Sequence, residues 1–422
     1  MKKLFAIGSA ALLALALVSC DGGNGTGTGN GNGKTIQLTY SGTASDQEFN
    51  EGLFEDFKAA RKAAGDPNTY EITYEQHGPD KVDSEVIDWS VGPDVFEFAS
   101  DKLAGLYNKG ALAKVSGQYA KFIDQELNNF AQACATFNDT YYAYPYTGDN
   151  TYYLQYDSSV ISAEQAKSMM DVLDAAHEAG MKVGYNLGEG FWGAGAMFTF
   201  GADYNITFTE DGNIASVSAD FNSEKGLKAA KAILEIVSHP AFVNTADVPT
   251  VSNDLCATIG GTWNISNAEG KGIKDFFGEN YACAVMPTVT VDGETKNLGA
   301  FLGGKLLGVN PQRAAGDVDR LVAAHELAKF LAGKECQLAR FEHASIAPCH
   351  VEAAANQDVA ASPNVAVLSA QGAFAHAQTS VPDGVWSAPN VLVTAMINGE
   401  CTADNLQEYI DAFNNTVIGK TE

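Results

Sequence analysis

The sequence predicts two α/β lobes between which the chain crosses several times, and three observations support this architecture. First, a chain of 422 residues is too long for one small hydrophobic core, so two domains are the default expectation. Second, strand-like and helix-like patterns alternate, which is typical of βαβ units around a parallel sheet. Third, the aromatic-rich stretch 141–157 is interrupted at Pro145, Gly148 and Asp149. Because proline cannot donate to a sheet ladder, we expect a strand, a bend and a second strand that leaves for the other lobe.

In the first part of the chain, the hydrophobic pattern predicts strand, helix and strand in turn. Alternation over 35–40 predicts a strand, and Ser45 with Glu48 three residues later predicts a helix with a capping box. Gly65 and Pro67 are expected to end that helix. Two further strands are predicted at 70–74 and 95–98, and the second is expected to be buried.

The alternation resumes after the predicted crossing. A helix capped by Ser162 and Gln165 is expected to end at Gly180, and a strand follows at 182–187. The remaining elements are predicted as strands at 285–291 and 301–309 and as helices that begin at Ser223, at Asp317 and near residue 404.

The composition is that of a globular protein with an acidic surface. Hydrophobic residues make up 45% of the chain, and 52 Asp and Glu against 26 Lys and Arg give a net charge of −26. Such a surface repels nucleic acid and anionic lipid headgroups, so we expect neither as a partner. No nucleophile elbow, Walker-type loop, nicotinamide fingerprint or His-Glu-x-x-His helix occurs, and we expect no cofactor and no metal.

Residues 1–33 have the pattern of an export signal followed by a tether. A positively charged start precedes an apolar run over 4–18 that is too short to span a membrane comfortably. The run ends in Leu-Val-Ser-Cys, which resembles a bacterial lipobox, whose cysteine is acylated after the signal is cut just before it. An ordinary signal peptide with an incidental Cys20 is the alternative. Residues 22–33 alternate Gly with Asn and Thr, so we expect a flexible tether.

The other cysteines invite two interpretations. Exported proteins can form disulfides in an oxidising compartment, and Cys336 with Cys349 is the candidate structural bridge. His343 and His350 lie close by in the sequence, which makes a metal cluster the alternative, although the spacing fits no usual zinc pattern.

Carboxylates and aromatic rings recur just after predicted strands, where open α/β sheets bind their ligands. Ring faces stack on the C–H faces of sugars, and carboxylates accept hydrogen bonds from sugar hydroxyls. The candidate ligand-binding residues are Phe98, Asp101, Lys102, Asp149, Glu189, Phe191, Trp192, Trp263 and Trp386. Each type also has a structural interpretation: Asp101 as a helix cap, Asp149 on a hairpin turn, Glu189 on a loop, and the tryptophans in the core.

Four segments resemble, in order and spacing, the maltose/maltodextrin-binding proteins, which are family 1 extracellular solute-binding proteins of ABC importers. The segments are 92–115, 142–161, 182–208 and 257–310. The resemblance runs from about residue 34 to the end, and it implies a periplasmic-binding-protein fold of type II, in which two lobes are joined by a hinge and a sugar is held between them. It further implies a binding protein rather than an enzyme, ABC permease subunits as partners, and a monomer.

The family's site residues can be carried over position by position. Its ring-carboxylate-arginine strand end corresponds to Phe98, Asp101 and Lys102, and its Glu-Pro-aromatic-aromatic stretch to 189–192. Its hinge-proximal carboxylate and stacking tryptophan correspond to Asp149 and Trp263. The chain departs from the family where phenylalanine replaces tryptophan at 98, lysine replaces arginine at 102 and phenylalanine replaces tyrosine at 191. The family's late tryptophan aligns near Pro389, three residues after Trp386, and the carboxylate nearest to its first-strand aspartate is Asp46.

These observations predict a lipoprotein that captures a sugar or oligosaccharide of maltodextrin type, anchored in the cell envelope and facing the periplasm or the cell exterior. The expected organisation is a signal peptide (1–19), a lipidated cysteine with a tether (20–33), an N-lobe (34–146 plus about 303–335) and a C-lobe (147–302 plus about 336–422). The alternatives are a surface glycan-degrading enzyme that uses Asp149 and Glu189, or a binding protein for a non-sugar solute.

Overall fold

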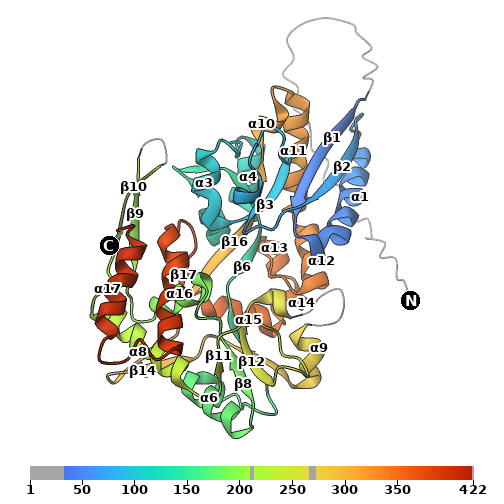
Figure 1. The fold of residues 1–422 in the computed structure, drawn as a ribbon. Helices are drawn as coiled ribbons and strands as arrows, with labels where there is room; N and C mark the ends of the chain where they lie inside the picture. Colours follow the sequence, from blue (N-terminus) through green and yellow to red (C-terminus); the bar gives the residue numbers. More distant parts are fainter. Residues whose placement is uncertain (1–32, 210–212, 266–271, 421–422) are drawn as a thin grey trace, which may run out of the picture.

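The computed structural model describes residues 33–209, 213–265 and 272–420, which form two lobes, each a sheet flanked by helices (Figure 1). The predicted two-lobe α/β architecture is therefore confirmed. Cys20, the signal peptide and nearly all of the tether lie outside the described residues. None of the helices in the described part of the chain combines the length and apolar character that crossing a membrane requires.

The first lobe is built on a mixed sheet with the strand order β17-β16-β3-β1-β2, and β6 pairs with β16 as well. The strands β1, β2 and β3 run parallel to one another, as predicted, whereas β16 runs antiparallel to β3 and β6. The bounds are β1 Thr35–Gly42, β2 Thr69–Gln76, β3 Val95–Ala99, β6 Ala143–Asn150, β16 Ala300–Val309 and β17 Ala375–Ala377.

Helices α1 and α11 pack against this sheet because each presents an apolar stripe to it. Phe57 of α1, Leu38 of β1 and Leu327 of α11 are all fully or almost fully buried in one core cluster. The predicted capping box is wrong, because Ser45 lies in a 3₁₀ turn and α1 begins two residues later without a side-chain cap. Asp317 does cap α11, accepting from the Arg320 backbone N–H. The helices here are α1 Gln47–Ala63, α3 Leu103–Asn108, α4 Gln118–Glu126, α5 Asn129–Cys134, α11 Val318–Leu331 and α12 Lys334–Ala344.

The second lobe has a sheet with the order β11-β8-β12-β7-β13, covered by amphipathic helices. The predicted strand at 182–187 is shorter than expected, since β8 ends at Gly184. The strand predicted at 285–291 begins only at Thr288, and as β14 it pairs with β15 in a separate hairpin. The strands are β7 Tyr153–Asp157, β8 Lys182–Gly184, β11 Phe242–Val243, β12 Leu255–Gly260, β13 Tyr281–Ala284, β14 Thr288–Val291 and β15 Glu294–Asn297. The main helices are α6 Met169–Glu178, α7 Gly190–Met197, α8 Glu224–Ser238, α16 Asp383–Ile397 and α17 Leu406–Val417.

The chain first crosses between the lobes after Asn150, not at Pro145. The strand β6 continues through Pro145, which pairs with Leu306 of β16 at an irregularity in the register. Among the described strands β6 pairs only with β16, so it is an edge strand, and Pro145 stands beside the irregularity in its pairing, the two kinds of place where a sheet tolerates proline. The next strand, β7, begins at Tyr153 in the sheet of the second lobe.

The candidate Cys336–Cys349 bridge is not present, because every cysteine in the described residues is a free thiol. Both side chains are buried in the core of the first lobe, in contrast to the expected domain boundary at residue 336. Burial raises the pKa of each of these two thiols to about 12. The described residues contain no group of His, Cys, Asp and Glu arranged to hold a metal ion.

Candidate functional site

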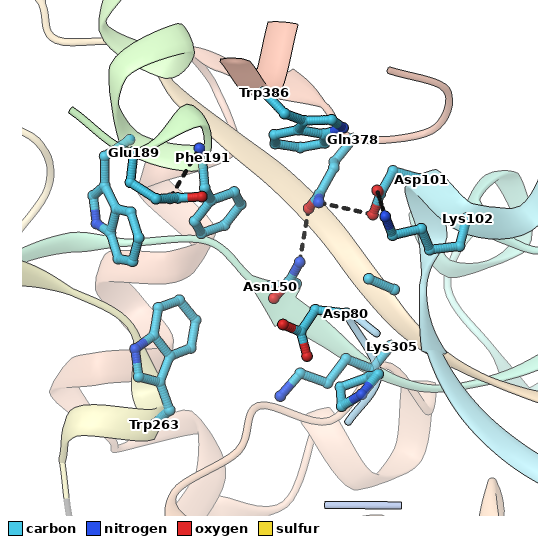
Figure 2. Close-up of a pocket in the computed structure, with 13 residues that line it drawn as sticks. Asp80, Asp101, Lys102, Asn150, Glu189, Phe191, Trp263, Lys305, Gln378 and Trp386 are labelled. Atoms are coloured by element: carbon cyan, nitrogen blue, oxygen red, sulfur yellow. Dashed lines mark hydrogen bonds and ion pairs between the residues drawn. The ribbon is translucent and has the colours of Figure 1, made fainter. Parts of the chain in front are cut away.

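A cavity of about 640 Å³ lies between the lobes, and its two walls differ in chemistry (Figure 2). The first lobe supplies charged side chains, whereas the second lobe supplies aromatic rings. The charged side chains are those of Asp80, Asp101, Lys102 and Lys305, and the rings are those of Phe191, Trp192, Trp263 and Trp386. The remaining lining residues are Pro79, Ala99, Asn150, Glu189 and Gln378. Such a cavity suits a ligand with an apolar face and polar edges.

Seven of the nine candidate residues line this cavity. Sequence positions almost 300 residues apart are thereby brought together, which requires both lobes to be folded. The seven are Asp101, Lys102, Glu189, Phe191, Trp192, Trp263 and Trp386.

The aromatic wall is held rigidly by contacts at the start of α7. The indole N–H of Trp192 donates to the carbonyl of Ile259 at 3.0 Å, and the Tyr152 hydroxyl donates to the carbonyl of Phe191 at 3.0 Å. The Phe191 ring lies parallel to that of Phe301 with centroids 5.9 Å apart. These contacts hold the start of α7 and its two rings in place without a ligand, which reduces the ordering that binding would require.

Trp263 projects from the short 3₁₀ helix η4 (Thr262–Asn264), directly after strand β12. It is 40% exposed, which is unusual for so large an apolar side chain. Gly261 makes this orientation possible, since a Cβ there would lie 2.5 Å from Cε3 of the Trp263 ring. The ring centroid is 6.3 Å from that of Phe191, and together they form one apolar surface.

Trp386 lies within α16. Pro382 is the N-cap, and Pro389 is part of the same helix. The Trp386 ring packs at 5.4 Å from that of Phe301, the residue that also supports Phe191. Phe191 and Trp386, which come from different helices, therefore pack on a common ring.

Glu189 is the N-cap of α7 and stands at the rim of the cavity. Its Oε2 accepts from the Phe191 backbone N–H at 3.1 Å, which fixes the carboxylate beside the rings. Desolvation by those surroundings raises the pKa of Glu189, and the charge of Asp80 raises it further. Because Asp80 belongs to the other lobe, two carboxylates interact across the cleft.

Asp101 lies in the 3₁₀ turn η2 (Ser100–Lys102) that follows β3, and it caps no helix. Its side chain is only 5% exposed, and Lys102 Nζ stands 3.7 Å from its Oδ2. Burial raises the pKa of Asp101 to about 6, although the Lys102 charge opposes that rise. Gln378 Nε2 donates to the Oδ1 of Asp101 at 2.9 Å.

Two candidates do not line the cavity. Phe98 is fully buried, because both faces of β3 are covered, and it packs at 5.7 Å from the Phe96 ring. Asp149 is 2% exposed, and its Oδ2 accepts from the Thr262 hydroxyl at 2.8 Å and from the Ala347 backbone N–H at 3.1 Å. The carboxylates of Asp149 and Glu189 therefore do not share a cavity, which removes the arrangement that a glycosidase would need.

Sequence reasoning missed four polar residues of the site. Asn150 is adjacent to Asp149, and only Asp149 is a candidate in the sequence analysis. Lys305 lies on the strand predicted at 301–309, in which no ligand-binding residue was proposed. Asp80 follows the second strand of the first lobe, where a polar residue could have been noticed. Nothing in the sequence marked Gln378, whose position depends on how the chain returns to the cleft after β17.

Comparison with known proteins decides the family. The model of the bacterial extracellular solute-binding proteins matches residues 31–367. The chain belongs to this family. Its members are binding proteins, and membership implies a location in the cell envelope. A comparison of the sequence with curated proteins gave no match.

Solved structures share the fold of this solute-binding protein over nearly its whole length. One that was solved with acarbose has a TM-score of 0.78 and 27% identity, covering 92% of this chain and 100% of the other. The maltodextrin-binding protein MalE1 of L. casei BL23, without ligand, has a TM-score of 0.73 and 20% identity, with 91% and 99% covered. A cyclo/maltodextrin-binding protein complexed with maltotetraose has a TM-score of 0.67 and 17% identity, with 91% and 98% covered.

Proposed function

We propose that this solute-binding protein captures a sugar or oligosaccharide of maltodextrin type between its lobes and delivers it to the permease subunits of an ABC importer. The observation that carries the proposal is the division of the cavity into an aromatic wall on one lobe and a charged wall on the other. Sugars present these two kinds of surface, C–H faces and hydroxyl edges. Similar structures contain acarbose and maltotetraose, which supports the same ligand class here.

In this mechanism the second lobe provides the stacking rings and one acceptor, Glu189, while the first lobe provides the other hydrogen-bonding groups. Trp263 and Phe191 would stack on sugar faces, with Trp192 and Trp386 extending the wall. Hydroxyl groups would donate to Asp101 and Glu189 and accept from Lys102. A cavity of about 640 Å³ lies within the roughly 300–1,000 Å³ usual for ligand sites. Since the two halves of the site belong to different lobes, a ligand that touches both favours the closed arrangement.

The N-terminal segment would hold this protein at the membrane. The lipobox-like sequence supports cleavage after residue 19, acylation of Cys20 and a tether over 20–33. The family resemblance further suggests that the protein acts as a monomer. Detergent phase partition of the wild type and Cys20→Ser, followed by mass spectrometry of the N-terminal peptide, tests this. An unmodified Cys20 in a protein that partitions into the aqueous phase would refute the anchor.

Isothermal titration against a ligand panel tests the sugar assignment. The panel contains maltose, maltotriose, maltotetraose and acarbose, with a peptide and a phosphate ester as controls. We expect at least one sugar to bind with a Kd at or below about 10 µM, which corresponds to roughly −7 kcal/mol. Tight binding of the peptide or the phosphate ester, without binding of any sugar, would overturn the carbohydrate assignment.

A further inference from the structure

The side chain of Gln378 joins the charged wall of the cavity to the strand that crosses between the lobes. Its Nε2 donates to Asp101 Oδ1 at 2.9 Å, and its Oε1 accepts from Asn150 Nδ2 at 2.7 Å (Figure 2). Asp101 follows β3 in the first lobe, and Asn150 is the last residue of β6 before the chain enters the second lobe. A continuous chain of hydrogen bonds thus runs from a buried carboxylate of the site to the hinge.

The position of Gln378 is fixed on several sides. The residue is 4% exposed, its backbone N–H donates to Leu302, and its carbonyl accepts from the Ser100 hydroxyl. Gly303 leaves the space that the amide fills, because a Cβ there would lie 2.5 Å from Oε1 of Gln378. A side chain held in this way cannot turn aside when the ligand binds.

Chemistry also sets which way the Gln378 amide faces. An ionised carboxylate only accepts hydrogen bonds, so the amide nitrogen must face Asp101 and the amide oxygen must face Asn150. This orientation occupies Oδ1 of Asp101 and leaves Oδ2, near Lys102, for a ligand hydroxyl. The donated bond also stabilises the ionised carboxylate in a place where burial disfavours it.

We propose that Gln378 is a positioning residue that holds Asp101 ready to accept a ligand hydroxyl and couples that contact to the hinge through Asn150. The proposal deepens the function proposed above and rests on it for the nature of the ligand. Neither Gln378 nor Asn150 needs to touch the ligand for this role, because each acts through Asp101 or through β6.

Several titratable groups surround Asp101, and their charges influence the pH at which its carboxyl titrates. A small cavity of about 170 Å³ beside the main one is also lined by Asp101 and Lys102. The titratable groups that share a cavity or an electrostatic interaction with Asp101 are Asp80, Asp83, Lys102, Glu189, Lys305, Asp383 and Tyr204. Removing one neutral amide changes none of these charges, so a shift in the titration of Asp101 after Gln378→Leu reflects the lost hydrogen bond and the less polar surroundings, not an altered charge.

The test compares Gln378→Leu with the wild type by two measurements. Carbon NMR titration of the Asp101 carboxyl needs no ligand, and we expect the leucine variant to raise its pKa because a donor to the ionised form is lost. Titration calorimetry with the best sugar between pH 5 and 8 should show about tenfold weaker binding at pH 7 and an upward move of the pH midpoint. In an Asp101→Asn background, Gln378→Leu should change affinity less than about twofold.

A second variant and a matched control test the role of Gln378 independently of Gln378→Leu. Gln378→Glu retains an acceptor for Asn150 but places a carboxylate against Asp101, so its binding should recover as the pH is lowered. Gln371→Leu, which alters a fully buried glutamine bonded to the Met286 backbone N–H, should reduce stability without moving the Asp101 titration. An unchanged Asp101 titration in Gln378→Leu would overturn the positioning role, whereas a shifted titration in a protein that binds no sugar would leave it standing and refute only the sugar assignment.

Discussion

The Cα of Trp386 lies 2.5 Å from the position that a Cβ at Gly190 would occupy. Helices α7 and α16 therefore meet backbone to backbone at this point, which is possible because Gly190 has no side chain. The close approach places Phe191 and Trp192 at the start of one helix beside Trp386 in the other, and so assembles the aromatic wall.

Gly190→Ala should separate these helices. Overpacking of this kind costs roughly 1–3 kcal/mol of unfolding free energy, and we expect weaker ligand binding as well, since Trp386 is displaced. Urea denaturation and calorimetry measure the two effects. Gly52→Ala is the control, because a Cβ there meets nothing within 4 Å in the middle of α1, and it should stabilise the protein by roughly 0.5–1 kcal/mol. Equal effects of both substitutions would contradict the close-packing argument.

Trp263→Ala should weaken sugar binding about tenfold or more while leaving the unfolding free energy nearly unchanged. The ring is 40% exposed in the cavity, so it contributes more to a ligand than to the core. Phe276 is 42% exposed on the same lobe outside the cavity, and Phe276→Ala should leave the affinity as it is. Full affinity in Trp263→Ala would remove this ring from the binding site.

Asp149 should hold in place the loop that carries Trp263, and it should not accept a hydrogen bond from the ligand. Both of its hydrogen bonds reach the same oxygen, so Asp149→Asn can keep them and should change sugar affinity less than about threefold. Asp149→Ala leaves two donors unpaired and should lower the unfolding free energy by roughly 2–5 kcal/mol. A large loss of affinity in an Asp149→Asn protein that remains stable would show that this carboxylate contacts the ligand.

Asp101→Asn should stabilise the protein at neutral pH at the expense of binding. The pKa of Asp101 is raised from 3.8 in the unfolded reference to about 6 in the folded protein, so its stabilising contribution is complete below 3.8 and is lost as the pH rises through 6. At pH 7.5 the ionised group therefore costs at most about 3 kcal/mol, which the asparagine variant avoids. Urea denaturation at pH 4 and pH 7.5 should show the gain only at pH 7.5, with the surface variant Glu55→Gln showing none.

Much of the fold followed from local pattern. The strands at 35–40, 70–74 and 95–98 were predicted because alternating or mainly apolar runs lie between turn signals, and the helix after Asp317 was predicted from its cap and its apolar stripe. The ring and carboxylate clusters at 189–192 and at Trp263 were found because they directly follow such strands. These features depend on neighbours within a few residues, which a sequence displays.

Only the tertiary structure decided which side chains face the cavity. Phe98 and Asp149 occupy strand positions where both faces are covered, and the sequence does not show what covers them. Gln378 lies in the site because the segment between β17 and α16 passes beside Asp101, which is 277 residues earlier in the sequence. Local propensities determined the elements of this protein, but long-range packing determined its site, because a side chain's surroundings are set by segments that meet only when both lobes have folded.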